Sequence, residues 1–146
     1  MVLAVVLAMG IVSASARAHS ELARSLPADG ERVAEAPQAV ELVFTEPVEV
    51  ALSVFKVYPL SSPPEALDDP PRLAELARQL VAQVLDRRDD RDRRVDAEVQ
   101  ADQATTARVR LALRPDLQPG AYVVMWRVLS LDTHVSQGFT TFVYRP

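Results

Sequence analysis

The chain has 146 residues, which is enough for one compact domain with a hydrophobic core and too few for two. It carries 16 basic and 20 acidic residues, a formal net charge of −4, so the basic face that nucleic-acid binding requires is not expected. Because the chain has no cysteine, a disulfide scaffold, a zinc finger, a thiolate-bound Cu(I) site and a cysteine nucleophile are all excluded.

The first eighteen residues differ in composition from the rest of the chain. They are apolar from Val2 to Val12, then small and polar, and they end in "ARA". The apolar part is too short to span a bilayer, and its small-residue ending is typical of a secretory cleavage site. We therefore expect residues 1–18 to be a signal peptide, with an uncleaved membrane anchor as the alternative. Cleavage would start the mature chain at His19 and leave it without a membrane span.

The next part of the chain shows strand patterns separated by turns. Residues 27–30, "PADG", contain the Asp-Gly pair of a turn. Apolar and polar residues alternate from Val40 to Phe44, which predicts a strand with one face on a core. Glu46-Pro47 ends this strand, and residues 48–58, rich in β-branched and aromatic side chains, are expected to form the next one.

Residues 60 to about 94 interrupt this pattern. The stretch "SSPPEALDDPP" is a proline-rich loop, in which Asp69 stands in a capping position before two prolines that favour a helix start. The apolar residues that follow have helical spacing: Leu73, Leu76, Ala77, Leu80, Val84 and Leu85. The subsequent run "DRRDDRDRR" is mixed in charge. We expect an amphipathic helix laid on the domain and then a solvated tail, with a docking helix for a partner as the alternative.

Strand patterns return in the last third of the chain, over residues 95–101, 107–113, 121–130 and 138–144. Tyr122 and Trp126 lie four residues apart in the most apolar of these strands, and we interpret them as core anchors on one face. About six short strands separated by turns predict an all-β fold, an antiparallel sandwich or barrel. The helical segment is then an insertion between strands and not a second domain.

The most apolar strand is followed by Asp132-Thr133-His134, after which the sequence is expected to turn at Gly138 into the last strand. In an extended segment the side chains of Asp132 and His134 leave the same face, with Cα atoms roughly 6–7 Å apart. That placement suits two ligands converging on one metal ion. A carboxylate that merely orients an imidazole is also an ordinary arrangement, and the motif alone is weak evidence for a metal.

His19 and His134 are the two histidines of the chain. At a free N-terminus His19 would offer an α-amine and an imidazole nitrogen on one residue. Such a chelate suits Cu(II), which heads the divalent affinity series and favours tetragonal nitrogen and oxygen coordination. Together with Asp132 and His134 it would supply enough donors to fill a tetragonal plane. A solvated terminal histidine is the alternative interpretation.

These residues and several longer blocks resemble the CopC family of periplasmic copper-binding proteins, also called copper resistance protein C. The blocks are a histidine directly after a signal peptide, "SLPADGERV", "PQAVELVFTEPVE" and "LQPGAYVVMWRVLSLDTHVSQGFTTF", and they cover most of residues 19–58 and 95–146. The resemblance implies an immunoglobulin-like or cupredoxin-like Greek-key β-sandwich over residues 19–146 that binds one Cu(II). It implies as ligands His19, through amine and imidazole, Asp132 and His134, with Glu46 as a candidate neighbour of the ligands.

The chain departs from the family pattern in two places. The family often has glycine between the aspartate and the histidine and proline after them, where this chain has Thr133 and Val135. The 60–94 insertion is also longer than the family leads us to expect.

Some members of the family hold Cu(I) in a methionine-rich loop, but here Met1 and Met9 leave with the signal peptide. Only Met125 remains, inside a strand, which argues against a thioether site.

Three classes of function are compatible with these residues. The first is a periplasmic or secreted Cu(II) carrier or buffer in copper homeostasis or resistance, expected as a monomer that delivers copper to a CopD-like inner-membrane importer. The second is a mono-copper oxygenase with an N-terminal histidine brace, and the third is a metal-free adhesive sandwich domain. Because Asp132 would fill the fourth equatorial position and leave only weak axial sites, we favour binding over catalysis and expect no enzyme.

Overall fold

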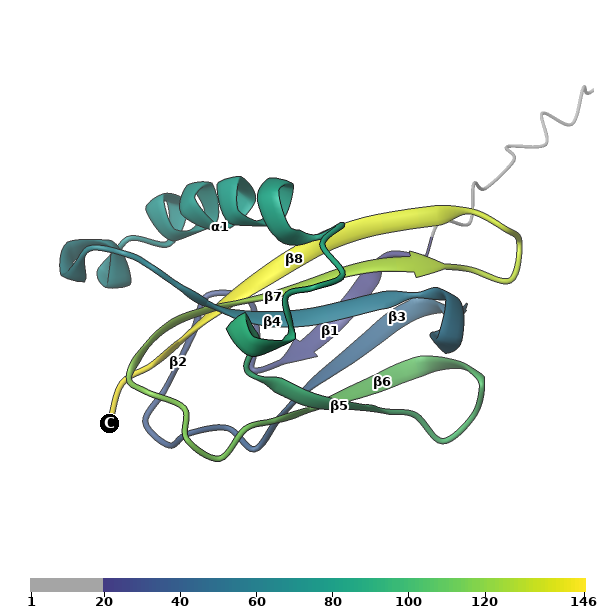
Figure 1. The fold of residues 1–146 in the computed structure, drawn as a ribbon, viewed down its shortest axis with the longest axis horizontal. Coiled ribbons are helices and arrows are strands. Elements are labelled where there is room, and N and C mark those ends of the chain that lie inside the picture. The colour runs from purple at the N-terminus through teal and green to yellow at the C-terminus, as the bar shows by residue number, and fades with distance from the viewer. Residues whose placement is uncertain (1–19) are drawn as a thin grey trace, which may run out of the picture.

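The computed structural model describes residues 20–146; the expected signal peptide and His19 lie outside the described residues. The described chain forms two four-stranded sheets that pack face to face, with one α-helix outside them (Figure 1). One sheet has the strand order β1-β3-β6-β5 and the other β2-β8-β7-β4. The elements are β1 (Leu22–Leu26), β2 (Glu31–Val33), β3 (Ala39–Glu49), β4 (Val54–Leu60), α1 (Pro70–Val84), β5 (Asp96–Gln100), β6 (Thr105–Leu113), β7 (Gly120–Leu129) and β8 (Val135–Tyr144).

The predicted all-β sandwich with a helical insertion is confirmed, and the two separate sheets decide against a barrel. All pairings are antiparallel except that of β2 with β8, which is parallel. The sequence patterns missed β1 and β2. Both strands are short and mostly exposed, so they lack the apolar alternation by which a strand is recognised.

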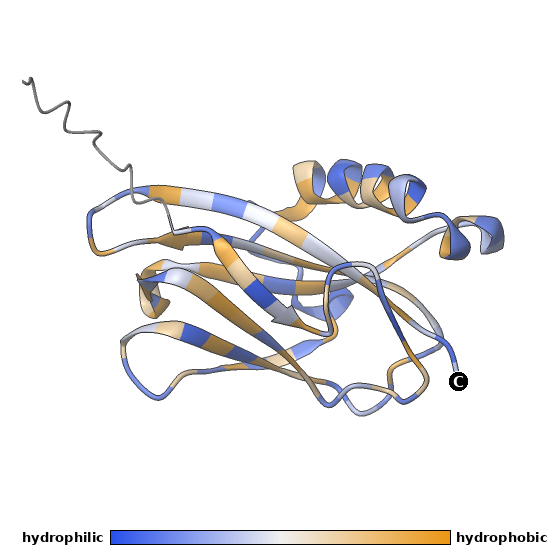
Figure 2. Ribbon diagram, turned by 180° about the vertical axis from the view of Figure 1, so that it is seen from behind, coloured by the Kyte–Doolittle hydropathy of each residue, from blue (hydrophilic) through white to orange (hydrophobic). Residues whose placement is uncertain are grey.

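The main core lies between the two sheets. Figure 2 shows apolar and polar residues alternating along several strands, which places every second side chain in this core. Val40, Leu42 and Phe44 are at most 2% exposed, as their alternation predicts. Tyr122 and Trp126 are buried in the same core, where the Trp126 ring meets Phe44 edge-on at a centroid distance of 6.0 Å. Their interpretation as core anchors is confirmed.

A second, smaller core lies where α1 covers the outer face of the β2-β8-β7-β4 sheet (Figure 1). The helix begins as predicted, because the Asp69 side chain accepts the backbone N–H of Arg72 at 3.1 Å. Its buried face carries Leu73, Ala77 and Val84, which pack with residues of β7 and β8. Met125 belongs to this second core and is fully buried.

The prediction of a solvated tail after α1 is wrong at Asp90, which is 1% exposed. Its carboxylate accepts hydrogen bonds from Lys56 Nζ at 2.6 Å and from the Tyr58 hydroxyl at 2.5 Å. Lys56 is itself buried on β4 and also donates to the carbonyl oxygens of Val84 and Arg87. A buried ammonium requires acceptors, and the last residue of α1 and the segment after it supply all three of them.

The predicted single strand over residues 48–58 is also wrong, because a 3-10 turn at Val50–Leu52 separates β3 from β4. The chain bends there as it crosses from one sheet to the other. β4 is an edge strand, and Val95 and Asp96, at the start of β5, cover its edge. The Val57 N–H donates to the Asp96 carboxylate at 2.7 Å, and the Val57 carbonyl accepts from the Val95 N–H at 2.9 Å. Within residues 20–146 no helix is long and apolar enough to cross a membrane.

Candidate metal centre

The Asp-Thr-His segment forms the hairpin turn between β7 and β8, at the end of the sandwich where β1 begins (Figure 1). The Thr133 N–H donates to the Ser130 carbonyl and the Ser130 N–H to the His134 carbonyl, both at 3.0 Å. Thr133 has a φ of 68°, in the left-handed region. These features are those of a three-residue hairpin loop, a type I turn followed by one left-handed residue.

The expectation of an extended segment at this point is therefore wrong, yet the two side chains do meet. Oδ2 of Asp132 lies 2.9 Å from Nδ1 of His134. The left-handed residue between them reverses the chain and brings the carboxylate and the imidazole to the same side of the turn. Glycine adopts this left-handed conformation readily, whereas threonine at position 133 restricts the backbone and stiffens the loop.

Gly138 does not form the turn that the sequence suggested. It lies within β8, directly opposite Trp126 on β7. A Cβ atom added at this position would lie 2.6 Å from Cζ2 of the indole ring. The glycine is thus required by the close approach of the Trp126 side chain, which crosses over it.

The Asp132 carboxylate is held on both of its oxygens. Oδ1 accepts the Ser130 hydroxyl and the His134 N–H, the latter at 3.3 Å, while Oδ2 faces the imidazole. The hydrogen bond from Ser130 and the further bonds from His134 outweigh desolvation and lower the pKa of Asp132 to about 2. The carboxylate is consequently charged at neutral pH and suited to bind a cation.

The described chain contributes two candidate metal ligands at the β7–β8 turn. The side chains of His134 and Asp132 are 59% and 43% exposed, so an ion in solvent can reach them. Glu46 is exposed on β3, two residues before Val48, whose backbone bridges to Ser130. Within residues 20–146 no three His, Cys, Asp or Glu side chains gather closely enough to hold a metal, so Glu46 is not grouped with the pair. Carboxylate oxygen and imidazole nitrogen fit Cu(II), but two donors do not complete its coordination.

The start of the described chain lies at the same corner. The Ser136 hydroxyl, two residues after His134, donates to the carbonyl oxygen of Ser20, and Ser20 is 1% exposed. The next residue is paired with β3, because the Glu21 N–H donates to the Thr45 hydroxyl at 3.1 Å and the Thr45 N–H to the Glu21 carbonyl at 2.8 Å. The residue that directly follows His19 is therefore anchored beside the strand that follows His134. No pattern in the sequence pointed to Ser136.

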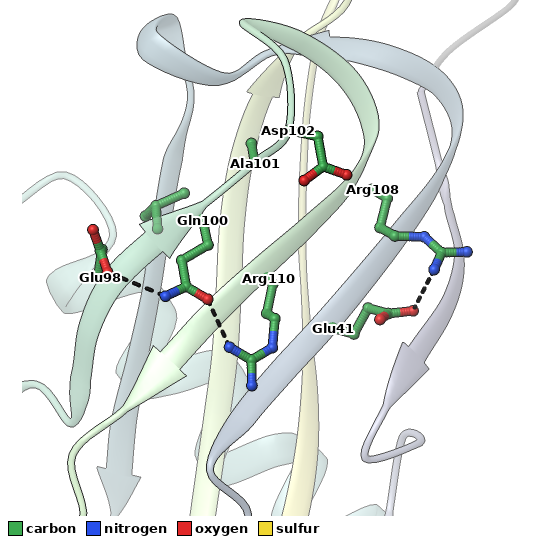
Figure 3. Close-up of a pocket in the computed structure, with 8 residues that line it drawn as sticks. Glu41, Glu98, Gln100, Ala101, Asp102, Arg108 and Arg110 are labelled. Atoms are coloured by element: carbon green, nitrogen blue, oxygen red, sulfur yellow. Dashed lines mark hydrogen bonds and ion pairs between the residues drawn. The ribbon is translucent and has the colours of Figure 1, made fainter.

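A surface pocket away from the β7–β8 turn is a weaker candidate for a binding site. It lies on the outer face of β3, β6 and β5 and contains no histidine (Figure 3). Its charged side chains interact with their neighbours across the strands: Arg108 with Glu41 at 3.7 Å, and Arg110 with Gln100 at 2.6 Å. With two arginines and three acidic residues, the pocket concentrates no charge of one sign. The lining residues are Glu41, Glu98, Val99, Gln100, Ala101, Asp102, Arg108 and Arg110.

Comparison with known proteins gives consistent matches over most of the chain. A family model described as the CopC domain matches residues 22–145. Among curated proteins, Protein YobA of Escherichia coli (strain K12) is 29% identical over 137 residues, which is 94% of this chain and 87% of that protein.

Solved structures share the fold. CopC from Methylosinus trichosporium OB3b superimposes with a TM-score of 0.60 and 24% identity, covering 88% of this chain and 95% of its own. PcoC, described as a methionine-rich copper resistance protein from Escherichia coli, has a TM-score of 0.59 and 28% identity, covering 88% of this chain and all of its own.

Proposed function

The chain belongs to the CopC family, and from this membership we propose that it binds one Cu(II) at the β7–β8 corner. The proposed ligands are His19, through its amine and imidazole, Asp132 and His134. Glu46 is proposed as a neighbour of this set and not as a ligand. Copper is the cargo of the protein in this proposal, which describes a carrier or buffer in copper homeostasis or resistance.

The observation that carries the proposal is the hydrogen bond from Ser136 to Ser20. Ser20 is joined to His19 by one peptide bond, and Ser136 is two residues from His134. The length of a residue is about 3.3–3.8 Å, so a chelating residue at position 19 has the reach to approach the Asp132–His134 pair. The pairing of Glu21 with Thr45 directs the chain to the same end of the sandwich.

The donor chemistry favours binding over catalysis. A carboxylate, two imidazoles and an amine are hard or borderline donors that stabilise Cu(II), whereas Cu(I) prefers sulfur. Met125, the methionine of the described chain, is buried in the second core and out of reach of the corner. A site with four equatorial donors and no thioether holds Cu(II) and changes oxidation state poorly, which is the behaviour of a carrier.

The location and partner complete the proposal. We propose that residues 1–18 are removed on export, that the mature monomer is periplasmic or secreted, and that it passes copper to a CopD-like inner-membrane transporter. The leader-like composition of residues 1–18 and the family membership support these points.

The test begins with the exported protein. Mass spectrometry of the purified product should give a mature chain that starts at His19, and Cu(II) titration followed by electron paramagnetic resonance should reach one ion per chain in a tetragonal nitrogen and oxygen environment. Asp132→Asn should weaken binding, whereas Asp116→Asn, an exposed aspartate at the β6–β7 turn, should not. A chain with one residue added before His19 should lose the chelating amine and most of its affinity. Unchanged affinity in that variant would refute the proposed ligand set.

Copper affinity should also depend on pH. Copper displaces protons from an amine and from imidazoles, whose ordinary pKa values are about 8 and about 6.5. Protons therefore compete increasingly as the pH falls, and the affinity should drop steeply between neutral pH and about pH 5. An affinity that is constant over this range would contradict coordination by these groups.

A further inference from the structure

Ser130 is not one of the proposed copper ligands, yet its side chain contacts both Asp132 and His134 at the β7–β8 turn. Its side chain is buried, and its hydroxyl lies close to two acceptors, Oδ1 of Asp132 and the carbonyl oxygen of His134, the latter at 3.0 Å. A hydroxyl has one proton to donate, and a charged carboxylate is a stronger acceptor than a carbonyl. The proton is therefore assigned to the bond with Asp132.

This bond fixes the rotation of the Asp132 carboxylate, whose two oxygens are otherwise equivalent. The terminal torsion of an aspartate has broad, two-fold preferences, so the carboxylate of a half-exposed side chain does not orient itself. Here Oδ1 is occupied by the Ser130 hydroxyl and the His134 N–H, which leaves Oδ2 directed at Nδ1 of the ring, 2.9 Å away. The orientation of both candidate ligands thus depends on contacts to Oδ1.

Ser130 is well placed for this role because its own position is fixed. Its backbone N–H donates to the His134 carbonyl, and its backbone forms an isolated bridge with Val48, which is fully buried. Val48 lies on β3, so the bridge connects the end of β7 to the opposite sheet. The Ser130 hydroxyl is thus fixed by the core of the sandwich, and it donates to the exposed carboxylate of Asp132.

We propose that Ser130 is a positioning residue of the copper site, whose hydroxyl holds the Asp132 carboxylate in the orientation that directs Oδ2 at His134. The copper readout of this inference rests on the proposed function; the orientation itself is a property of the metal-free protein. The two are tested separately.

In metal-free protein, the His134 ring resonances measured by nuclear magnetic resonance report the Nδ1–H bond to Asp132. Ser130→Ala should shift or broaden them. In the Cu(II) titration the same variant should bind about 10-fold to 100-fold more weakly, the usual cost of losing an outer hydrogen-bond partner, with altered copper hyperfine splitting. Ser130→Thr keeps the hydroxyl and should restore most of the affinity.

The matched control is Ser53→Ala. The Ser53 hydroxyl donates to the Glu49 carbonyl at 2.7 Å and accepts the Leu129 N–H at 3.2 Å, so it also supports this end of the sandwich. Both of these bonds join Ser53 to backbone atoms of Glu49 and Leu129, and not to the carboxylate of Asp132. Ser53→Ala should lower the thermal midpoint and leave the ring resonances and the copper spectrum unchanged.

A double-mutant cycle separates positioning from general support. If Ser130 acts through Asp132, Ser130→Ala should cause no further loss of copper affinity in an Asp132→Ala background. Equal losses in both backgrounds would overturn the proposal, as would wild-type ring resonances in metal-free Ser130→Ala. If Ser130→Ala does not fold, Ser130→Thr and Ser130→Val compare a hydroxyl with a methyl group of the same shape. A wild-type chain that binds no copper would refute the proposed function, while the ring resonances would still decide the orientation.

Discussion

Replacement of Thr133 by glycine should stabilise the metal-free protein. Thr133 has a φ of 68°, where the Cβ of any residue other than glycine crowds the backbone, at a cost of about 1–2 kcal/mol. Glycine removes this cost but makes the unfolded chain more flexible, which takes back about 0.4–1 kcal/mol. The Thr133 side chain is exposed, so its loss sacrifices no burial. The expected net gain is about 0.5–1 kcal/mol in the free energy of unfolding.

The gain is measured by urea and thermal unfolding of the metal-free protein at neutral pH, where it should raise the midpoint by about 2–4 °C for a domain of this size. The matched control is Thr105→Gly, because Thr105 lies in β6 and has no positive φ. Glycine there should destabilise by at least about 0.5–1 kcal/mol, since it adds flexibility and also removes a half-buried side chain. If Thr133→Gly lowered the midpoint as Thr105→Gly does, the assignment of backbone strain to this turn would be refuted.

The other predictions concern the fold around the site. Gly138→Ala should destabilise by about 1–3 kcal/mol, because the new methyl group would lie 2.6 Å from the Trp126 ring; a melting midpoint equal to wild type would contradict this packing. Asp90→Asn should cost about 3 kcal/mol in urea unfolding, because it leaves the buried Lys56 ammonium uncompensated, whereas the exposed neighbour Asp89→Asn should cost little. Burial alone would raise the pKa of Asp90, but the hydrogen bonds from Lys56 and Tyr58 outweigh it and lower the pKa below its ordinary value of 3.8. The stabilisation of the fold by the charged Asp90 carboxylate is therefore present above pH 3.8 and is lost as the pH falls through the pKa of the folded state. Unfolding titrations of Asp90→Asn should lack that acid-dependent loss.

The parts of the fold that were predictable are those with local periodicity. The alternation from Val40 to Phe44 and the spacing of Tyr122 and Trp126 place side chains on one face of a strand, and the core forms on that face. The helix start at Asp69 is equally local, because a cap and its N–H partner lie three residues apart. β1 and β2 escaped prediction because short, exposed strands carry no such periodicity.

Charge and polarity patterns were poorer guides. The run after α1 has the composition of a solvated segment, yet Asp90 is buried because Lys56, 34 residues earlier, needs an acceptor. The sequence predicts a turn at Gly138, whereas this glycine is required by the Trp126 ring on the neighbouring strand. In both cases the deciding partner lies on another element, which no local pattern can identify.

For the candidate site, residue type and spacing alone made Asp132 and His134 only a weak pair of candidates, and the resemblance to the CopC family implied their role as ligands. Only the tertiary structure decided that they sit in a hairpin turn, that Ser130 orients the carboxylate, and that Ser136 holds Ser20 beside them. Ser20 and Ser136 are 116 residues apart in the chain. Their contact arises from the register of β8 and the path of the chain into β1, and such long-range geometry is a product of sheet packing that residue order alone does not display.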